Sequence, residues 1–529
     1  MLVAGLPLFG VLISLWPSTS ITWADVSRFT HYNGLASSIA QSFGVALVAP
    51  LIGLYIAFMV FSQYRFHPRW QQLEQRLAPL LSLPHLAVAL GLVYLFGTNG
   101  MLWDSLWHFF DTATPSWLGL PHKSIFTVIL AISIKEVPFF LLVLSAISRQ
   151  LPIQAWLLQG RALGYSEAVS WWLLIFPAML KQSRLALLAA MAYSLSVLDI
   201  SILIGPNIPS LYSVVLYQWQ TGFSTIEQSN AYLGNMLLLL MLSLLVGAIY
   251  LHEWLSVKRL KSAAVLAKSL LISRINRIFV VWLALFSLLS LAILLTFLLW
   301  SLGGEQLSSE NLSLSLWQEE WFFIQAPLLN SIYLAVISSL IGVALALLAL
   351  ELQRQAQWFI PDYLWLMAIL LPQLSMVYGW QLAHTGIDGN YNIVWVMLSH
   401  LPFTFAYSYL VLRGPFQSIN KYYELVAASL GYSYWQQWWK IRFNLLRPAL
   451  LTTTAIAFSV SIAQYVPTLL IGAGRIPTIT TEAVAIASGN EPRITAIYML
   501  SQALPPFIAF LVAALLAHRF RGSFDAKYH

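Results

Sequence analysis

Long apolar runs separated by short polar stretches dominate the chain. Each run is continuous rather than alternating, which is typical of membrane-spanning helices and not of the strands of a membrane barrel. A helix needs about 20 residues to cross the hydrocarbon layer. We therefore predict about twelve transmembrane helices, at roughly 2–16, 36–61, 78–97, 122–147, 184–204, 231–251, 278–301, 325–352, 363–382, 391–412, 449–471 and 495–518.

Composition supports a chain that is solvated by lipid. Hydrophobic residues make up 59% of the 529 residues and charged residues 9%, whereas soluble domains carry about 25% charged residues. The absence of cysteine excludes disulfides and thiolate metal sites. We expect an all-α polytopic membrane protein with no cofactor, no bound metal and no nucleic-acid partner, because the basic residues lie in short loops between apolar runs.

The basic residues also predict an orientation. Of the 27 Lys and Arg residues, 22 fall in loops on one side of the twelve predicted segments, four fall on the other side, and Lys135 falls within a segment. Loops rich in Lys and Arg stay in the cytoplasm. We therefore expect both termini to be cytoplasmic, in a multi-pass protein of the bacterial inner membrane.

The two halves of the chain share motifs at a nearly constant spacing, which indicates an internal repeat. We predict a first repeat at 1–260 and a second at 261–529. Each has an even number of spans, so the repeats are parallel and a pathway would lie between them. The matching pairs are Gln41–Gly53 with Asn330–Gly342, Leu83–Leu86 with Leu371–Leu374, Glu136–Phe139 with His400–Phe403, and Leu163–Ser166 with Leu430–Ser433.

Two predicted cytoplasmic loops, 148–183 and 413–447, are far longer than a turn requires. Each contains a short helix-compatible stretch that ends at a glycine, Gly164 or Gly431, suited to a left-handed helix cap. Tryptophans follow in both loops and could anchor an interfacial helix at the lipid headgroups. We favour a docking role for the glycine-terminated helices, because a short exposed helix can seat in a groove of a soluble partner.

The pattern around these glycines resembles the coupling loop of binding-protein-dependent ABC importer permeases: Glu-Ala-Ala, three residues, Gly, nine residues, Ile, one residue, Leu-Pro. The loops also depart from it, since the Glu position holds Leu158 and Leu425, and the final Pro is Asn444 in the second half. Glu424 adjoins the missing Glu. The positions that match are Gly164, Leu174, Phe176 and Pro177 in the first half, and Ala427, Gly431, Ile441 and Phe443 in the second.

The double-unit layout is similar to the fused permeases of thiamine and ferric iron importers, and the segment 476–485 resembles the YnjC-type fused permeases still more. This resemblance implies six helices per repeat in the MetI-like permease fold, two copies of an ABC ATPase below and a periplasmic substrate-binding protein above. The chain itself has no phosphate-binding Gly-x-x-x-x-Gly-Lys-Ser/Thr loop, so we do not expect an enzyme. The residues implied in ATPase coupling are Arg161, Gly164, Tyr165, Pro177, Glu424, Ala427, Gly431 and Tyr432.

Four polar residues within the predicted spans are candidates for the pathway: Glu136, His400, Asp199 and Gln464. Charged groups within the bilayer are costly, so they usually face protein or water. Glu136 and His400 each lie two residues before a proline and are predicted to occupy equivalent places. Glu136 could instead pair with Lys135, and all four could serve only to join helices.

Two other functions remain open on the sequence alone. A proton-coupled secondary transporter could use Glu136, Asp199 and His400 as a relay. A membrane-embedded enzyme is disfavoured, because the chain has no nucleophile elbow and no metal-ligand spacing such as His-Glu-x-x-His.

Overall fold

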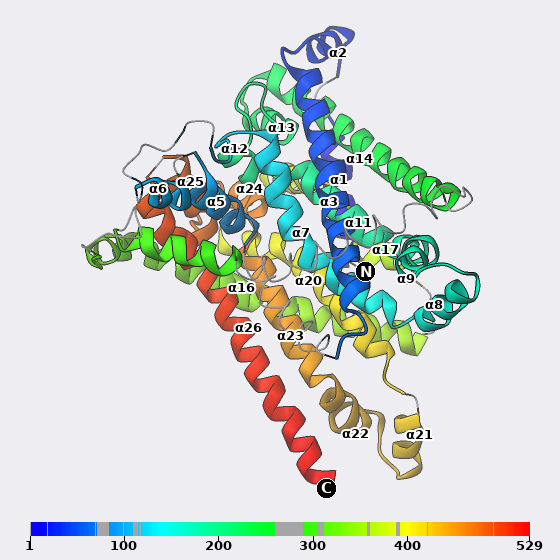
Figure 1. The fold of residues 1–529 in the computed structure, drawn as a ribbon. Coiled ribbons are helices and arrows are strands. Elements are labelled where there is room, and N and C mark those ends of the chain that lie inside the picture. Colours follow the sequence, from blue (N-terminus) through cyan, green and yellow to red (C-terminus); the bar gives the residue numbers. More distant parts are fainter. Residues whose placement is uncertain are drawn as a thin grey trace.

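The computed structural model describes residues 2–17, 20–68, 70, 84–98, 100–108, 110, 115, 118–259, 289–303, 312–356, 360–387, 392–420, 422–489 and 491–528. Within these ranges the regular structure is helical, with two isolated β-bridges and no strand (Figure 1). This confirms the predicted all-α polytopic fold. The boundary predicted between the repeats, at 260/261, lies outside the described residues and stays a prediction.

The first half combines three long helices with several shorter ones. Its elements are α1 (Leu2–Ser14), α2 (Trp23–Thr30), α3 (Leu35–Tyr64), α5 (His85–Phe96), α6 (Met101–His108), α7 (Ile125–Ser148), α8 (Ile153–Ala162), α9 (Glu167–Ser170), the π-helix η1 (Trp171–Ile175), α10 (Phe176–Gln182), α11 (Arg184–Ser196), α12 (Asp199–Ile204), α13 (Tyr212–Thr221) and α14 (Thr225–Arg259).

The second half follows the same order. Its elements are the helix Leu289–Ser301, then α16 (Ser315–Ala356), α17 (Asp362–Trp365), α18 (Met367–Leu370), α19 (Gln373–Ile387), α20 (Ile393–Gln417), α21 (Tyr422–Ser429), α22 (Tyr434–Gln437), the π-helix η3 (Trp438–Arg442), α23 (Phe443–Ile462), α24 (Val466–Gly472), α25 (Ile479–Ser488) and α26 (Pro492–Tyr528).

Seven of the described helices are long and apolar enough to cross a membrane, and an eighth span results if the bent pair Glu167–Gln182 and Arg184–Ser196 counts as one. Each lies on a predicted segment. Of the other predicted segments, 2–16 is a shorter helix and 363–382 is broken, while 78–97 and 278–301 extend outside the described residues. The segment predicted at 363–382 is broken before Pro372, which lacks an N–H and holds Leu371 in an extended conformation.

The repeat is regular in the structure. Gly164 and Gly431 both adopt left-handed backbone conformations, with φ of 80° and 78°, and they lie 267 residues apart. The same spacing separates the two π-helices η1 and η3, α12 from α24, and α14 from α26. Between α3 and α16 the spacing is 289. Matching hydrogen bonds define it: Ser42 accepts the backbone N–H of Tyr212, and Ser331 accepts that of Ile479.

This register corrects the predicted equivalence of Glu136 and His400, which are 264 residues apart. The N-cap residues of α7 and α20, Ser124 and Asn392, are 268 residues apart. Glu136 therefore corresponds to Thr404, one helical turn beyond His400. The Pro-Phe motifs match in sequence at a spacing that the helix starts do not share.

The first helix of each half packs against the other half. In α1, Gly10 lies so close to Gly379 of α19 that a Cβ on Gly379 would overlap the Gly10 carbonyl, and Trp380 donates a hydrogen bond to the Leu6 carbonyl at 2.8 Å. The helix Leu289–Ser301 packs in the same way on α5 of the first half, where Trp300 stacks on Tyr94. Small residues permit such close helix contacts in membranes.

Candidate functional site

The two loops that resemble coupling loops share one backbone design. The helix α8 ends at Gly164 and α21 ends at Gly431. The next N–H bonds back to a carbonyl five residues earlier, from Tyr165 to Gly160 at 2.9 Å and from Tyr432 to Ala427 at 3.0 Å. This is the Schellman arrangement, which requires φ > 0 at the glycine. The Gly-Tyr-Ser repeat thus encodes a helix end followed by a new helix start.

A serine begins the next helix in each loop. Ser166 accepts the N–H of Val169, and Ser433 accepts that of Gln436, as N-cap residues do. Each new helix then continues through a π-helical turn. Sequence reasoning missed these π-turns; the paired tryptophans at 171–172 and 438–439 are the shared sequence feature at both sites.

Both coupling helices expose apolar side chains at equivalent positions. Leu158 and Leu163 on the first loop are 63% and 70% exposed, and their counterparts Leu425 and Leu430 are 68% and 70% exposed. In Figure 1, α8 and α21 lie on the right of the molecule, whereas α6 and α25 lie on the left. Four leucines at matched positions form a paired apolar surface at the loops.

The second loop is held by a network of ion pairs. Glu424 on α21 contacts two guanidinium groups, those of Arg354 on α16 and Arg442 on η3, the latter at 2.8 Å. Arg442 also pairs with Glu351 at 2.6 Å, and Tyr434 donates its hydroxyl hydrogen to Glu351. The Arg442 side chain is only 5% exposed. Glu424 therefore faces inward and ties α21 to the membrane-spanning helices.

The first loop is held by apolar contacts instead. Leu157 and Ile175 are buried, and Trp171 packs edge-on against Phe58 and Phe61 of α3. Trp171 is 2% exposed. It is therefore a core residue rather than a membrane-interface anchor.

The remaining predicted coupling residues differ in exposure. Arg161 is exposed and pairs with Glu167 at 3.0 Å, while Ala427 is buried and Pro177 is half-buried in α10. In the second loop Trp435 and Trp439 are exposed, as an interface anchor would be.

The four predicted pathway residues separate into two groups. His400 uses both ring nitrogens, one with the Ser461 hydroxyl and one with the Thr468 hydroxyl, each at 2.9 Å. Gln464 lines the same small space, which has no room for water, and its side chain accepts a hydrogen bond from Gln373. This group is satisfied within the protein.

Glu136 and Asp199 form the other group. The carboxylate of Glu136 lies 3.8 Å from His85 Nε2, and His85 also acts electrostatically on Asp199, the first residue of α12. His85 therefore interacts with both carboxylates.

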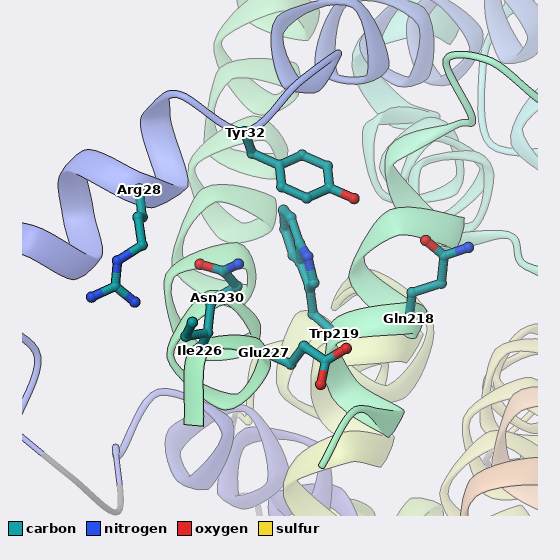
Figure 2. A pocket seen from close by; sticks show the side chains of 7 residues that line it. All are labelled: Arg28, Tyr32, Gln218, Trp219, Ile226, Glu227 and Asn230. Atoms are coloured by element: carbon teal, nitrogen blue, oxygen red, sulfur yellow. The ribbon is translucent and has the colours of Figure 1, made fainter. Parts of the chain in front are cut away.

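A separate cavity of about 540 Å³ opens between α2, α13 and α14 (Figure 2). Tyr32 and Trp219 meet edge to face at its wall, with ring centroids 5.0 Å apart. Close by, hydrogen bonds from Thr22 lower the pKa of Asp25. None of the predicted site residues lines this cavity. Its lining residues are Arg28, Tyr32, Gln218, Trp219, Ile226, Glu227 and Asn230.

Comparison with known proteins identifies the family. The chain is 31% identical to the inner membrane ABC transporter permease protein YnjC of Escherichia coli (strain K12), over 96% of this chain and 97% of that protein. The chain belongs to the ABC transporter permeases. Its duplicated helical units and paired loops are therefore those of a permease subunit, which confirms the resemblance inferred from the sequence.

Two further relatives match parts of the permease. It is 25% identical to a spermidine/putrescine transport system permease protein PotC homolog of Mycoplasma pneumoniae, over 31% of this chain and 59% of that protein. It is 26% identical to the molybdenum transport system permease protein ModB of Mycobacterium bovis, over 30% and 68% of the two chains. No family model and no solved structure matches the permease.

Proposed function

We propose that the permease is the membrane subunit of an ATP-driven importer, and that each coupling loop receives one copy of an ABC ATPase. The supporting observation is the pair of exposed leucine sites, Leu158 with Leu163 and Leu425 with Leu430, on helices of identical design. Apolar helix faces of this kind fit into grooves of a partner protein. Two sites in one chain match two ATPase subunits.

The backbone offers a direct route from each loop into the membrane. Downstream of Gly431, the helix Tyr434–Ile462 runs without interruption from the loop through η3 into α23. In the first half α9, η1 and α10 lead to α11 across a 66° bend. ATP-driven approach of the two ATPases would push the loops together, and these helices would carry the displacement to the contact between the halves.

In this proposal the coupling loops and both termini lie in the cytoplasm of a cell with an inner membrane. A periplasmic binding protein would deliver substrate on the opposite side, near α6 and α25. The names of the PotC and ModB relatives favour import of a small solute. The permease supplies the pathway, and the ATPase subunits supply the hydrolysis.

The test is purification of the tagged full-length permease from its native membranes, followed by identification of co-purifying subunits and an ATP hydrolysis assay. We expect a subunit with a phosphate-binding Gly-x-x-x-x-Gly-Lys-Ser/Thr loop, at two copies per permease. The double variant Leu158→Asp/Leu425→Asp should lose it.

Leu312→Asp is the matched control, because Leu312 is an exposed leucine that precedes α16 and lies outside both loops. This variant should retain the ATPase. Retention of ATP hydrolysis by the double coupling-loop variant would refute docking at these leucines.

A further inference from the structure

Polar side chains from both halves gather around His85. We call these residues the inter-half cluster: His85, Glu136, Tyr193 and Asp199 from the first half, and Tyr407 and Tyr465 from the second. They come from α5, α7, α11, the start of α12, α20 and the residue before α24. Since α11 contacts α18 and α19, and α12 contacts α25, this cluster lies where the two halves meet.

The cluster is joined by direct contacts. The imidazole of His85 lies 3.8 Å from Glu136, and its centroid is 4.6 Å from the Tyr193 ring. The charges of Glu136 and Asp199 both act on the Tyr193 phenol, and Tyr407 also lies within electrostatic range of it. The charge of Asp199 also acts on the Tyr465 phenol. Glu136 and Asp199 thus lie within electrostatic range of Tyr193, and each also acts on one further tyrosine, Tyr407 or Tyr465.

The cluster is accessible although it lies among buried residues. The side chain of His85 is 31% exposed. Tyr193, Asp199 and Tyr407 are half-buried, while the residues immediately before and after each of them in the chain are buried. Accessible polar groups at the contact between two membrane-embedded halves are what a solute path requires.

The Glu136 carboxylate has no hydrogen-bond donor among the residues that the structure describes, although Glu136 is only 5% exposed. Its contact to His85 is longer than a hydrogen bond. A buried carboxylate without such a partner is costly, and a ligand that donates to it would lower that cost.

Carboxylates are the acidic groups of the cluster, and no guanidinium group is among its residues. Lys135 precedes Glu136, is buried and acts electrostatically on it, so it offsets one carboxylate. The charge that acts on Asp199 is that of His85. The cluster thus holds two carboxylates, those of Glu136 and Asp199, beside a single lysine, Lys135.

The second half differs at the same level. Gln373 stands at the position of His85, and its amide bonds to Gln464 at 2.7 Å. His400 is satisfied by two hydroxyls. The polar groups of the second half are therefore paired with one another, and the unsatisfied charge belongs to the first half.

We propose that the inter-half cluster binds the positively charged group of the transported solute, so that the permease imports an organic cation rather than an oxyanion. This inference rests on the proposed transport function. An ammonium group would donate hydrogen bonds to Glu136 and Asp199. The tyrosine rings would add cation–π attraction, and an oxyanion would meet carboxylates instead of guanidinium groups.

The proposal can be tested on the purified full-length permease in lipid nanodiscs by saturation-transfer NMR. The probes are ethanolamine and spermidine, organic cations whose ammonium groups carry N–H donors, and methanesulfonate as an anion, each titrated through the millimolar range. We expect saturable signals for the cations and none for methanesulfonate. Glu136→Gln and Asp199→Asn should each weaken the apparent cation affinity about tenfold, the loss of one favourable charge contact.

Glu319→Gln is the matched control, because Glu319 is an exposed carboxylate near the start of α16 and far along the chain from the cluster. It should bind the cations like the wild type. If Glu136→Gln does not yield a monodisperse helical protein, Asp199→Asn and Tyr193→Leu decide the outcome.

Three results would overturn the proposal: no cation binding to the wild type, cation binding that all cluster variants retain, or methanesulfonate binding that the cluster variants lose. Each is distinct from failure of the proposed function, which is judged by ATPase association at the coupling loops. A permease that couples to an ATPase but binds methanesulfonate at Glu136 would be an importer of anions.

Discussion

The two coupling loops have the same backbone but are held in place by opposite chemistry. Where the second loop uses Glu351, Glu424 and Arg442, the first has Ser62, Leu157 and Ile175 at the equivalent positions. The ionic network of the second loop thus replaces an apolar cluster. The glycine ends, serine caps and π-turns are the same in both. The shared local sequence therefore determines the backbone shape of both loops, whereas the contacts that hold each loop to the membrane-spanning helices differ.

This comparison has an energetic consequence. Apolar burial tolerates small changes in contact geometry, while a buried ion pair loses much of its value once one partner is removed. The second loop should therefore fail abruptly when a single charge is deleted. The first loop should weaken in proportion to the volume removed from its core.

The largest effect is expected for Arg442→Ala. It leaves Glu351 without a guanidinium partner and Glu424 with that of Arg354 alone, at a cost of about 3–5 kcal/mol. Limited proteolysis should then cut the second loop, at 413–447, much faster than in the wild type. Cleavage at an unchanged rate would show that the ionic network does not hold α21.

The matched control for Arg442→Ala is the triple variant Glu351→Ser/Glu424→Leu/Arg442→Ile, which copies the chemistry of the first half into the second. It removes three of the four charges together, so no carboxylate is left without its partner and Arg354 is the charge that remains. We expect it to resist proteolysis better than the single variant does. A triple variant that is cut faster than Arg442→Ala would contradict the equivalence of the two anchors.

A comparable loss is expected for Trp171→Ala in the first loop. The substitution opens a cavity beside Phe58 and Phe61, and such losses cost about 3–5 kcal/mol. Thermal unfolding in detergent measures it. Trp171→Phe is the control and should recover most of the stability, because the indole N–H of Trp171 has no hydrogen-bond partner in the structure.

A moderate and equal effect is expected for Gly164→Ala and Gly431→Ala. A Cβ would meet no atom at either site, so the cost comes from the left-handed backbone alone, about 1 kcal/mol each. Equal losses in thermal stability would support the shared helix end. A large difference between the two would show that the anchoring chemistry also acts on the glycines.

The smallest effect is expected for Arg161→Gln. Its ion pair with Glu167 is exposed, and such pairs contribute about 0.2–1 kcal/mol. Stability should change little, and added salt should remove the difference. A large loss of ATPase association without a loss of stability would instead identify Arg161 as a contact for the partner.

The sequence predicts the helices, the repeat and the two glycine-ended loops, because each depends on local patterns of apolar residues and on backbone conformations specific to glycine. It predicts neither the breaks before Pro372 and after Ser196 nor the anchor around Arg442. That anchor joins residues about 90 positions apart on helices whose rotation the sequence does not define.

The candidate pathway was predictable only in part. Glu136, Asp199, His400 and Gln464 stand out because polar residues are rare in apolar segments. Their partners depend on tertiary packing, which places two hydroxyls beside His400 and, among the described residues, no hydrogen-bond donor beside the Glu136 carboxylate. The motif around Pro138 and Pro402 suggested an alignment that the helix starts shift by one turn.

The helices α1 and Leu289–Ser301 each pack on the opposite half, and this exchange constrains how the halves can move relative to each other. Since α1 is tied by the chain to one half but packed on the other, neither half can tilt as an independent block. A motion that separates the halves would carry α1 and the helix Leu289–Ser301 along with the half on which each is packed, unless those contacts break.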